Sequence, residues 1–158
     1  MTKFKLEIDP PGFNDWHKLH RLLMDCIAYM EERIDPPSSL MQMSPETLRE
    51  KSREETLVIV RHNDELIACG FLKEASDAIY LGKLAVRHDR RGLGLLRKIV
   101  AEAEQLASSR NKNVLESQAR VELIEIHATF AALGFVQTST TAHEGYDRPT
   151  SITMRKFL

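Results

Sequence analysis

The chain has 158 residues, 42% of them hydrophobic and 28% charged, and its net charge is −1. These proportions predict one globular domain, residues 1–158, with a core of its own. A chain without a basic surplus is not expected to bind nucleic acid or an anionic membrane surface. No apolar run has the length of a membrane span, and the first residues lack the apolar stretch of a secretory signal. We therefore expect a cytoplasmic protein.

The cysteines and histidines indicate neither a disulfide framework nor a metal site. Cys26 and Cys69 lie in apolar runs, and the six histidines are scattered without the spacing of metal ligands. We expect two buried free thiols and no metal ion.

A strand, a helix and a loop are predicted at the start of the chain. Residues 3–8 alternate polar and apolar side chains, the pattern of a half-buried strand. Asn14 can cap the helix that follows, whose apolar residues recur at helical spacing: Trp16, Leu19, Leu23, Ile27 and Met30. The prolines of residues 35–43 then require a loop.

A short helix and a hairpin come next. Ser44 in front of Pro45 has the pattern of an N-cap before the first helical residue, and we expect this helix to end near residue 54. The runs 56–61 and 66–73 are rich in β-forming residues, and four polar residues separate them. They predict an antiparallel hairpin.

The most informative stretch joins a predicted strand, 79–86, to a helix that reaches about residue 109. Between them lie Gly92 and Gly94, which tolerate positive φ and leave the backbone open to a ligand. The first amides of a helix lack internal acceptors, so this loop can bind an anion such as a diphosphate. Six basic side chains surround it: Lys83, Arg87, Arg90, Arg91, Arg97 and Lys98. The glycine patterns of dinucleotide-binding folds and of nucleotide triphosphate loops are missing.

The rest of the chain predicts a strand at 114–117, a helix at 121–133 and two last strands at 135–141 and 150–156. Gly134 suits the left-handed turn that ends a helix. The order of elements is then β-α-α-β-β-β-α-β-α-β-β. It predicts an α+β fold with helices on both faces of a mixed sheet.

Two segments resemble motifs of the GNAT family of N-acetyltransferases. Arg91-Gly92-Leu93-Gly94, preceded by Lys83-Leu84-Ala85-Val86, is similar to the acyl-CoA-binding motif, and residues 126–135 are similar to the family's Ala-His-x-Phe-Tyr-x-x-Leu-Gly-Phe. The resemblance implies the three-layer α/β/α acyl-CoA N-acyltransferase fold, with a mixed, mostly antiparallel central sheet. It also implies acetyl-CoA as co-substrate, a primary amine of a small molecule or protein as acceptor, and direct attack of that amine. The chain is expected to act alone or as a homodimer.

The resemblance assigns cofactor contacts residue by residue. The backbones of Leu84 and Val86 would contact pantetheine between two splayed strands, and Arg87 or Arg97 would reach a CoA phosphate. Phe130 stands where many relatives carry a tyrosine beside the CoA sulfur. The pyrophosphate would bind the backbones of Arg91, Gly92, Leu93, Gly94 and Leu95.

Three positions depart from the family pattern. Asp89 replaces the usual Gln or Arg, Phe130 has no proton to give to sulfur, and Gly82 stands near the place of a glutamate base. Glu116 and His127 remain as candidate bases, although His127 also fits a packed structural histidine. These departures leave open an alternative function, a CoA-binding sensor with little turnover. Residues 35–43 are either a plain connection or a lid over the acceptor site.

Overall fold

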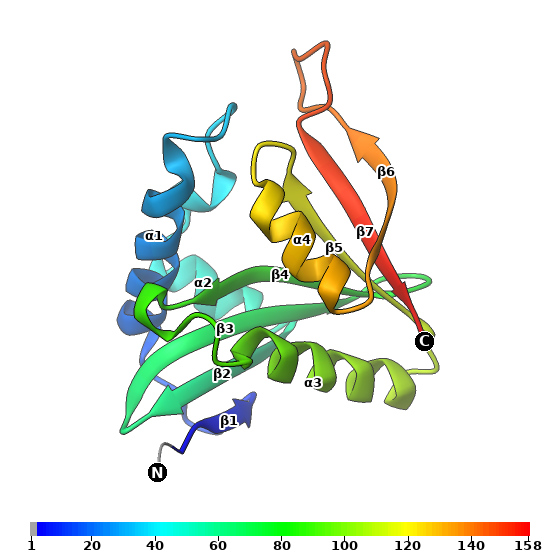
Figure 1. Cartoon of the computed structure of the whole chain (residues 1–158). Coiled ribbons are helices and arrows are strands. Elements are labelled where there is room, and N and C mark those ends of the chain that lie inside the picture. The colour runs from blue at the N-terminus through cyan, green and yellow to red at the C-terminus, as the bar shows by residue number, and fades with distance from the viewer. Residues whose placement is uncertain (1–2) are drawn as a thin grey trace.

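The computed structural model describes residues 3–158 and contains one seven-stranded sheet with four α-helices (Figure 1). The strand order is β1-β2-β3-β4-β5-β7-β6. The strands are β1 (Lys5–Ile8), β2 (Thr56–His62), β3 (Glu65–Glu74), β4 (Ile79–Val86), β5 (Val114–Arg120), β6 (Val136–Thr141) and β7 (Ser151–Phe157). The helices are α1 (Trp16–Glu31), α2 (Pro45–Lys51), α3 (Leu95–Ser109) and α4 (Ile124–Ala132), with short 3-10 turns at Ser39–Gln42 and His88–Arg90.

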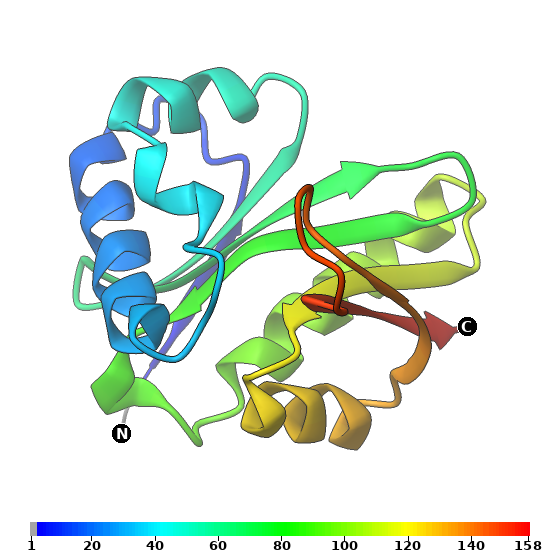
Figure 2. The same ribbon diagram turned by 90° about the horizontal axis from the view of Figure 1, so that it is seen from above.

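Helices cover both faces of the sheet, which confirms the predicted three-layer arrangement. Figure 2 shows α1 and α2 on one side and α3 and α4 on the other. Two apolar clusters fill the two gaps. One joins α1 and α2 to residues such as Phe71 on the α1/α2 face, and the other joins α3 and α4 to residues such as Leu81 on the α3/α4 face. Strand alternation therefore decides which side chains face which pair of helices.

Two local signals in the sequence are borne out at helix ends, at Ser44 and at Gly134. Ser44 accepts a hydrogen bond from the Thr47 amide in a capping box, and Gly134 has φ +97° after α4. Cys26 and Cys69 are free and buried. In the described residues 3–158, every helix is too short or too polar to cross a lipid bilayer.

Three local expectations need correction. The last helix begins at Ile124, not at residue 121, because β5 continues to Arg120 by pairing with β7. Asp15, not Asn14, occupies the N-cap position of α1, and no side chain caps it. The segment 35–43 is not wholly irregular, because it contains a 3-10 turn at Ser39–Gln42; Met41 is exposed in this turn, and Met43 after it packs against the α1/α2 cluster.

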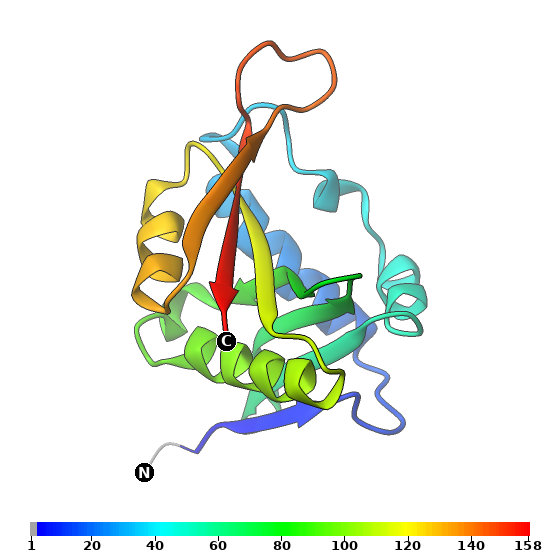
Figure 3. The same ribbon diagram turned by 90° about the vertical axis from the view of Figure 1, so that its right-hand side faces the viewer.

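The sheet opens in its middle. All neighbouring strands are antiparallel except β4 and β5, which are parallel and pair only at Ile79 with Leu115 and at Tyr80 with Glu116. Beyond these two rungs the strands diverge, and β5, β7 and β6 rise away from β4 (Figures 1 and 3). The carboxyl-terminal half of β4 therefore has a free edge toward β5.

A β-bulge shapes this free half of β4. The ladder with β3 shifts between Cys69 and Phe71, so that Lys83 and Leu84 lie opposite the single residue Gly70. Lys83 takes a left-handed conformation, with φ +48°. A bulge bends its strand and redirects the backbone groups next to it, and bulges are frequent beside active sites. Here it lies directly along the opening between β4 and β5.

Candidate functional site

We use the word slot for the space between the diverging backbones of β4 and β5, whose closed end lies at Leu81. The hydroxyl of Ser117, which is 2% exposed, donates a hydrogen bond of 2.8 Å to the Leu81 carbonyl. This bond is the last link across the two strands. From Gly82 onward the β4 backbone can pair with an extended molecule in place of a strand. The predicted contacts Leu84 and Val86 both lie along this edge.

The glycine loop lies at the open end of the slot and has the backbone that the sequence predicts. Gly92 and Gly94 have φ of +78° and +77°, and a Cβ at either one would meet no atom within 4 Å. Helix α3 begins directly afterwards at Leu95, which is 2% exposed and anchors the helix in the core. The first amides of α3 therefore face an unobstructed backbone loop, a site suited to a phosphate group.

Asp89 does not face this anion site with a free charge. Arg87 donates from Nε and Nη2 to the two Asp89 carboxylate oxygens, at 2.7 and 2.9 Å, and from Nη1 to Glu65 at 2.8 Å. The Arg87 guanidinium lowers the pKa of both carboxyl groups, through hydrogen bonds first and charge second. Asp89 therefore shapes the loop by holding Arg87.

Among the described residues, the other four basic side chains after Arg87 form no ion pair: Arg90, Arg91, Arg97 and Lys98. Arg97 is exposed on α3, and among the described residues it forms no ion pair, so it is freer than Arg87 to meet a phosphate. The Arg91 guanidinium lies 5.4 Å from the centre of the Tyr29 ring. It borders a cavity of about 330 Å³ between α1 and residues 87–91.

The α1/α2 face of the slot carries Glu116, which the sequence singled out as a candidate base, beside Tyr80 and Arg155, which it did not. Tyr80 and Glu116 are register partners, and both point to this face because Ile79 and Leu115 point to the other. Arg155 Nε donates a hydrogen bond of 2.8 Å to Oε2 of Glu116, and Arg155 Nη2 lies 2.7 Å from the same oxygen. The Glu116 carboxylate is therefore held in place beside Tyr80.

A second ion pair lies over the bulge. Lys83 Nζ is 3.5 Å from a carboxylate oxygen of Glu55, and only 14% and 7% of the two side chains are exposed. Lys83 also lies 5.1 Å from the centre of the Phe71 ring. Glu55 stands in the connection between α2 and β2, where no sequence pattern indicated a role. The pairing fixes the bulged residue on the α1/α2 face.

His127 and Phe130 lie on α4, at the opposite face of the sheet. His127 Nε2 is 2.8 Å from the Arg120 carbonyl, so this nitrogen is occupied at the end of β5. Phe130 is 4% exposed and packs edge-on against Phe135, with ring centres 5.0 Å apart. The structure thus brings Glu116, but not His127, to the α1/α2 face of the slot.

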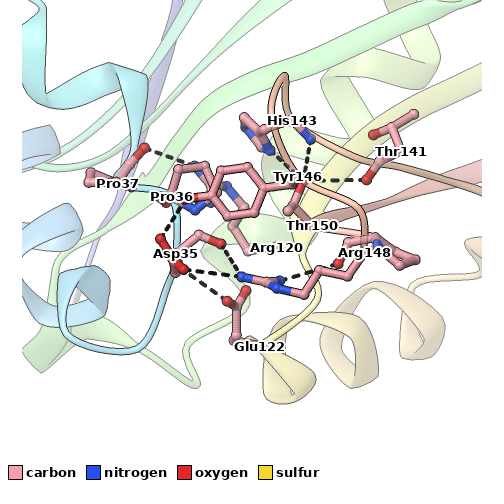
Figure 4. Close-up of polar contacts among 11 residues, drawn as sticks. Asp35, Pro36, Pro37, Arg120, Glu122, Thr141, His143, Tyr146, Arg148 and Thr150 are labelled. Atoms are coloured by element: carbon pink, nitrogen blue, oxygen red, sulfur yellow. Dashed lines mark hydrogen bonds and ion pairs between the residues drawn. The ribbon is translucent and has the colours of Figure 1, made fainter.

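The loop after α1 is fastened across the far end of β5 to the loop between β6 and β7 (Figure 4). Tyr146 donates to Asp35 at 2.7 Å, and Arg148 donates to the Asp35 carbonyl at 3.0 Å. Arg120 donates to the carbonyls of Pro36 and Pro37 at 2.6 and 3.0 Å. The segment predicted as a connection or a lid is therefore held at the end of β5 by hydrogen bonds from the side chains of Tyr146, Arg148 and Arg120.

An exposed ion pair adds a pH-dependent contact beside this loop. Arg33 donates to both carboxylate oxygens of Glu125, at 2.5 and 2.8 Å, and lowers its pKa from 4.5 to about 2. Because the folded pKa is depressed, the contact stabilises the fold above pH 4.5 and is lost as the pH falls toward 2. We expect Glu125→Gln to lower the melting temperature slightly at pH 6 and not at all near pH 2, in thermal unfolding across that range. If Glu125→Gln lowered the melting temperature equally at pH 6 and near pH 2, this pH dependence would be contradicted.

In the described part of the chain, no three His, Cys, Asp or Glu side chains are grouped to hold a metal ion. Most of the predicted cofactor contacts instead lie along the free edge of β4 and in the glycine loop that follows it. The chain matches the model of a family described as acetyltransferase (GNAT) family over residues 16–135. No curated protein matches it at a significant level.

Many solved structures share the fold. An acetyltransferase of the GNAT family from Staphylococcus aureus superposes with a TM-score of 0.75, at 11% identity, over 97% of this chain and 99% of its own. A GNAT family acetyltransferase from Elizabethkingia anophelis with acetyl-CoA bound gives 0.69 at 14% identity, over 98% of each chain. The ribosomal-protein-S18-alanine N-acetyltransferase from Escherichia coli gives 0.67 at 18% identity, over 97% and 94%. At these identities the likeness concerns the fold alone.

Proposed function

We propose that this chain, which belongs to the acetyltransferase (GNAT) family, is an N-acetyltransferase that moves an acetyl group from acetyl-CoA to a primary amine. Membership of the family follows from the match over residues 16–135, more than half of the chain. The acceptor is proposed to be an amine of a small molecule or of a protein. The amine attacks the thioester directly, without an acylated residue of the protein.

The observation that carries the proposal is the combination of a splayed β4–β5 pair with an anion-binding loop at its open end. An extended arm could pair with the free edge of β4 at Leu84 and Val86. A diphosphate at its other end would then meet the amides after Gly92 and Gly94. A neighbour with the same fold binds acetyl-CoA, which supports this reading of the slot.

The acceptor would approach from the α1/α2 face, near the loop of residues 35–43. An amine must lose a proton before it can attack a carbonyl, since its ammonium form has no free electron pair. Glu116 is the carboxylate that lies beside the closed end of the slot, and Arg155 fixes its orientation. We assign the base role to Glu116, in preference to His127, whose Nε2 is bonded to Arg120.

The alternative of a CoA-binding sensor receives no support from the comparisons. The neighbours described above all carry acetyltransferase names. The lack of a proton donor at Phe130, which motivated the alternative, does not exclude transfer, because a thiol has a pKa of about 8.5 and leaves readily as a thiolate.

Two measurements test the proposal. Release of free thiol from acetyl-CoA should be screened against amines, polyamines, aminoglycosides, amino acids and peptides, and at least one class should give turnover. Millimolar acetyl-CoA should also raise the melting temperature, because a ligand that binds only the folded state stabilises it. No turnover with any class, in a chain that acetyl-CoA stabilises, would reject transfer but retain binding. No shift in melting temperature and no heat of binding would reject both.

A further inference from the structure

The proposed transfer leaves one chemical requirement without a residue, a proton for the sulfur that departs from the acetyl group. Phe130, at the position implied for this role, is buried and has no ionisable proton. Gly82, on the other side of the slot, has no side chain. A proton donor at another position is therefore required if the protein supplies the proton.

Tyr80 occupies the space above Gly82. It lies on the last rung between β4 and β5, opposite Glu116, immediately before the strands part. A Cβ built on Gly82 would lie 3.1 Å from Cε1 of the Tyr80 ring, so the ring covers this glycine and extends toward the slot. A side chain at residue 82 would displace the ring. The glycine is thus explained by the position of Tyr80.

The thioester of a molecule bound in the slot would lie at the same end. Its diphosphate would bind at residues 92–95, beyond the carboxyl end of β4, and its arm would run back along the strand from Val86 toward Gly82. The closed end is fixed by the bond from Ser117 to Leu81. The reacting end of the arm would therefore reach the part of β4 that the Tyr80 ring covers.

The Tyr80 hydroxyl holds its proton at neutral pH. Burial, then the charges of Glu116 and Glu55, raise its pKa above the ordinary value, so the phenol is protonated at neutral pH.

We propose that the Tyr80 hydroxyl protonates the departing CoA sulfur, a role that Phe130 cannot fill. This assignment rests on the proposed function. The amine nitrogen forms a bond to the carbonyl carbon, the carbon–sulfur bond breaks, and its electron pair stays on sulfur. The Tyr80 proton then passes to that sulfur and gives the free thiol. The phenolate regains the proton that left the amine, through Glu116 or through solvent.

Replacement of the hydroxyl alone tests the kinetic consequence. Tyr80→Phe should lower kcat about tenfold and leave KM for acetyl-CoA nearly unchanged, because the ring still covers Gly82 and the thiolate is itself a fair leaving group. Adding Phe130→Tyr to this variant should recover much of the lost rate, since it returns a phenol to the other side of the slot. Tyr29→Phe, which removes an exposed hydroxyl from α1, is the matched control.

A binding measurement tests the assignment without turnover. At pH 9 a large fraction of the CoA thiol is thiolate. By calorimetry, the parent protein should then bind CoA about tenfold more tightly than desulfo-CoA, because a hydrogen bond to a charged group is strong. Tyr80→Phe should lose this preference. The preference in a protein that acetylates no amine would reject the transfer, and with it the protonation of a departing sulfur, and would retain only the contact between Tyr80 and the CoA sulfur. No preference in the parent, or the same kcat and preference in Tyr80→Phe, would overturn the assignment.

Discussion

Gly92→Val is expected to abolish measurable acetyl-CoA binding, with Kd raised more than a hundredfold, while the chain still folds. Gly92 has φ +78°, a conformation that a β-branched residue avoids at a cost of about 1–3 kcal/mol. No atom lies within 4 Å of a Cβ at this position, so the cost comes from the backbone and not from a clash. The loop would relax by turning its amides, and losing two hydrogen bonds to a charged phosphate accounts for a change of this size.

A control with the same strain separates binding from folding. Gly12 has φ +70° and equally open surroundings, but it lies in the turn between β1 and α1. Gly12→Val should lower the melting temperature by a similar amount and leave Kd for acetyl-CoA unchanged. Calorimetry and thermal unfolding of both variants provide the comparison. If Gly92→Val binds acetyl-CoA as tightly as the parent, the diphosphate site is elsewhere.

The parts of the fold that sequence predicts well depend on neighbours along the chain. The capping box at Ser44 needs only Thr47, and the left-handed turn at Gly134 needs only a residue without a Cβ. The strand before the glycine loop and the helix after it were predicted in the same way. Each of these features can be read from a few adjacent residues, because short-range geometry decides them.

The parts that were missed depend on residues far apart in sequence. Glu55 meets Lys83 only because β2, β3 and β4 are neighbours and a bulge turns Lys83 toward Phe71. The extension of β5 to Arg120 depends on its pairing with β7, so periodicity assigned residues after 120 to a helix too early. The residues next to Tyr80 in the sequence gave no indication of a role for it. Its position became informative once the register placed it opposite Glu116.

Glu116→Gln is expected to lower kcat/KM about a hundredfold at pH 7 if Glu116 is the base, in the range that general bases contribute. An alkyl amine has a pKa near 10.4, so at pH 7 almost all of the acceptor carries the proton that Glu116 must remove. As the pH rises, the neutral fraction grows about tenfold per unit, and the variant should approach the parent rate between pH 9 and 10. Glutamine preserves the size of the side chain and an oxygen for Arg155, so the protein should fold.

The matching variant at the other candidate gives the contrast. His127→Ala removes the side chain that bonds to the Arg120 carbonyl, and we expect a loss of stability with a pH profile of the parent's shape. Rates across pH 6–10, measured with the best amine from the thiol-release screen, distinguish the two residues. A deficit in Glu116→Gln that is the same at every pH would show that Glu116 positions the acceptor without taking its proton. Parental profiles in both variants would show that the amine loses its proton before it binds.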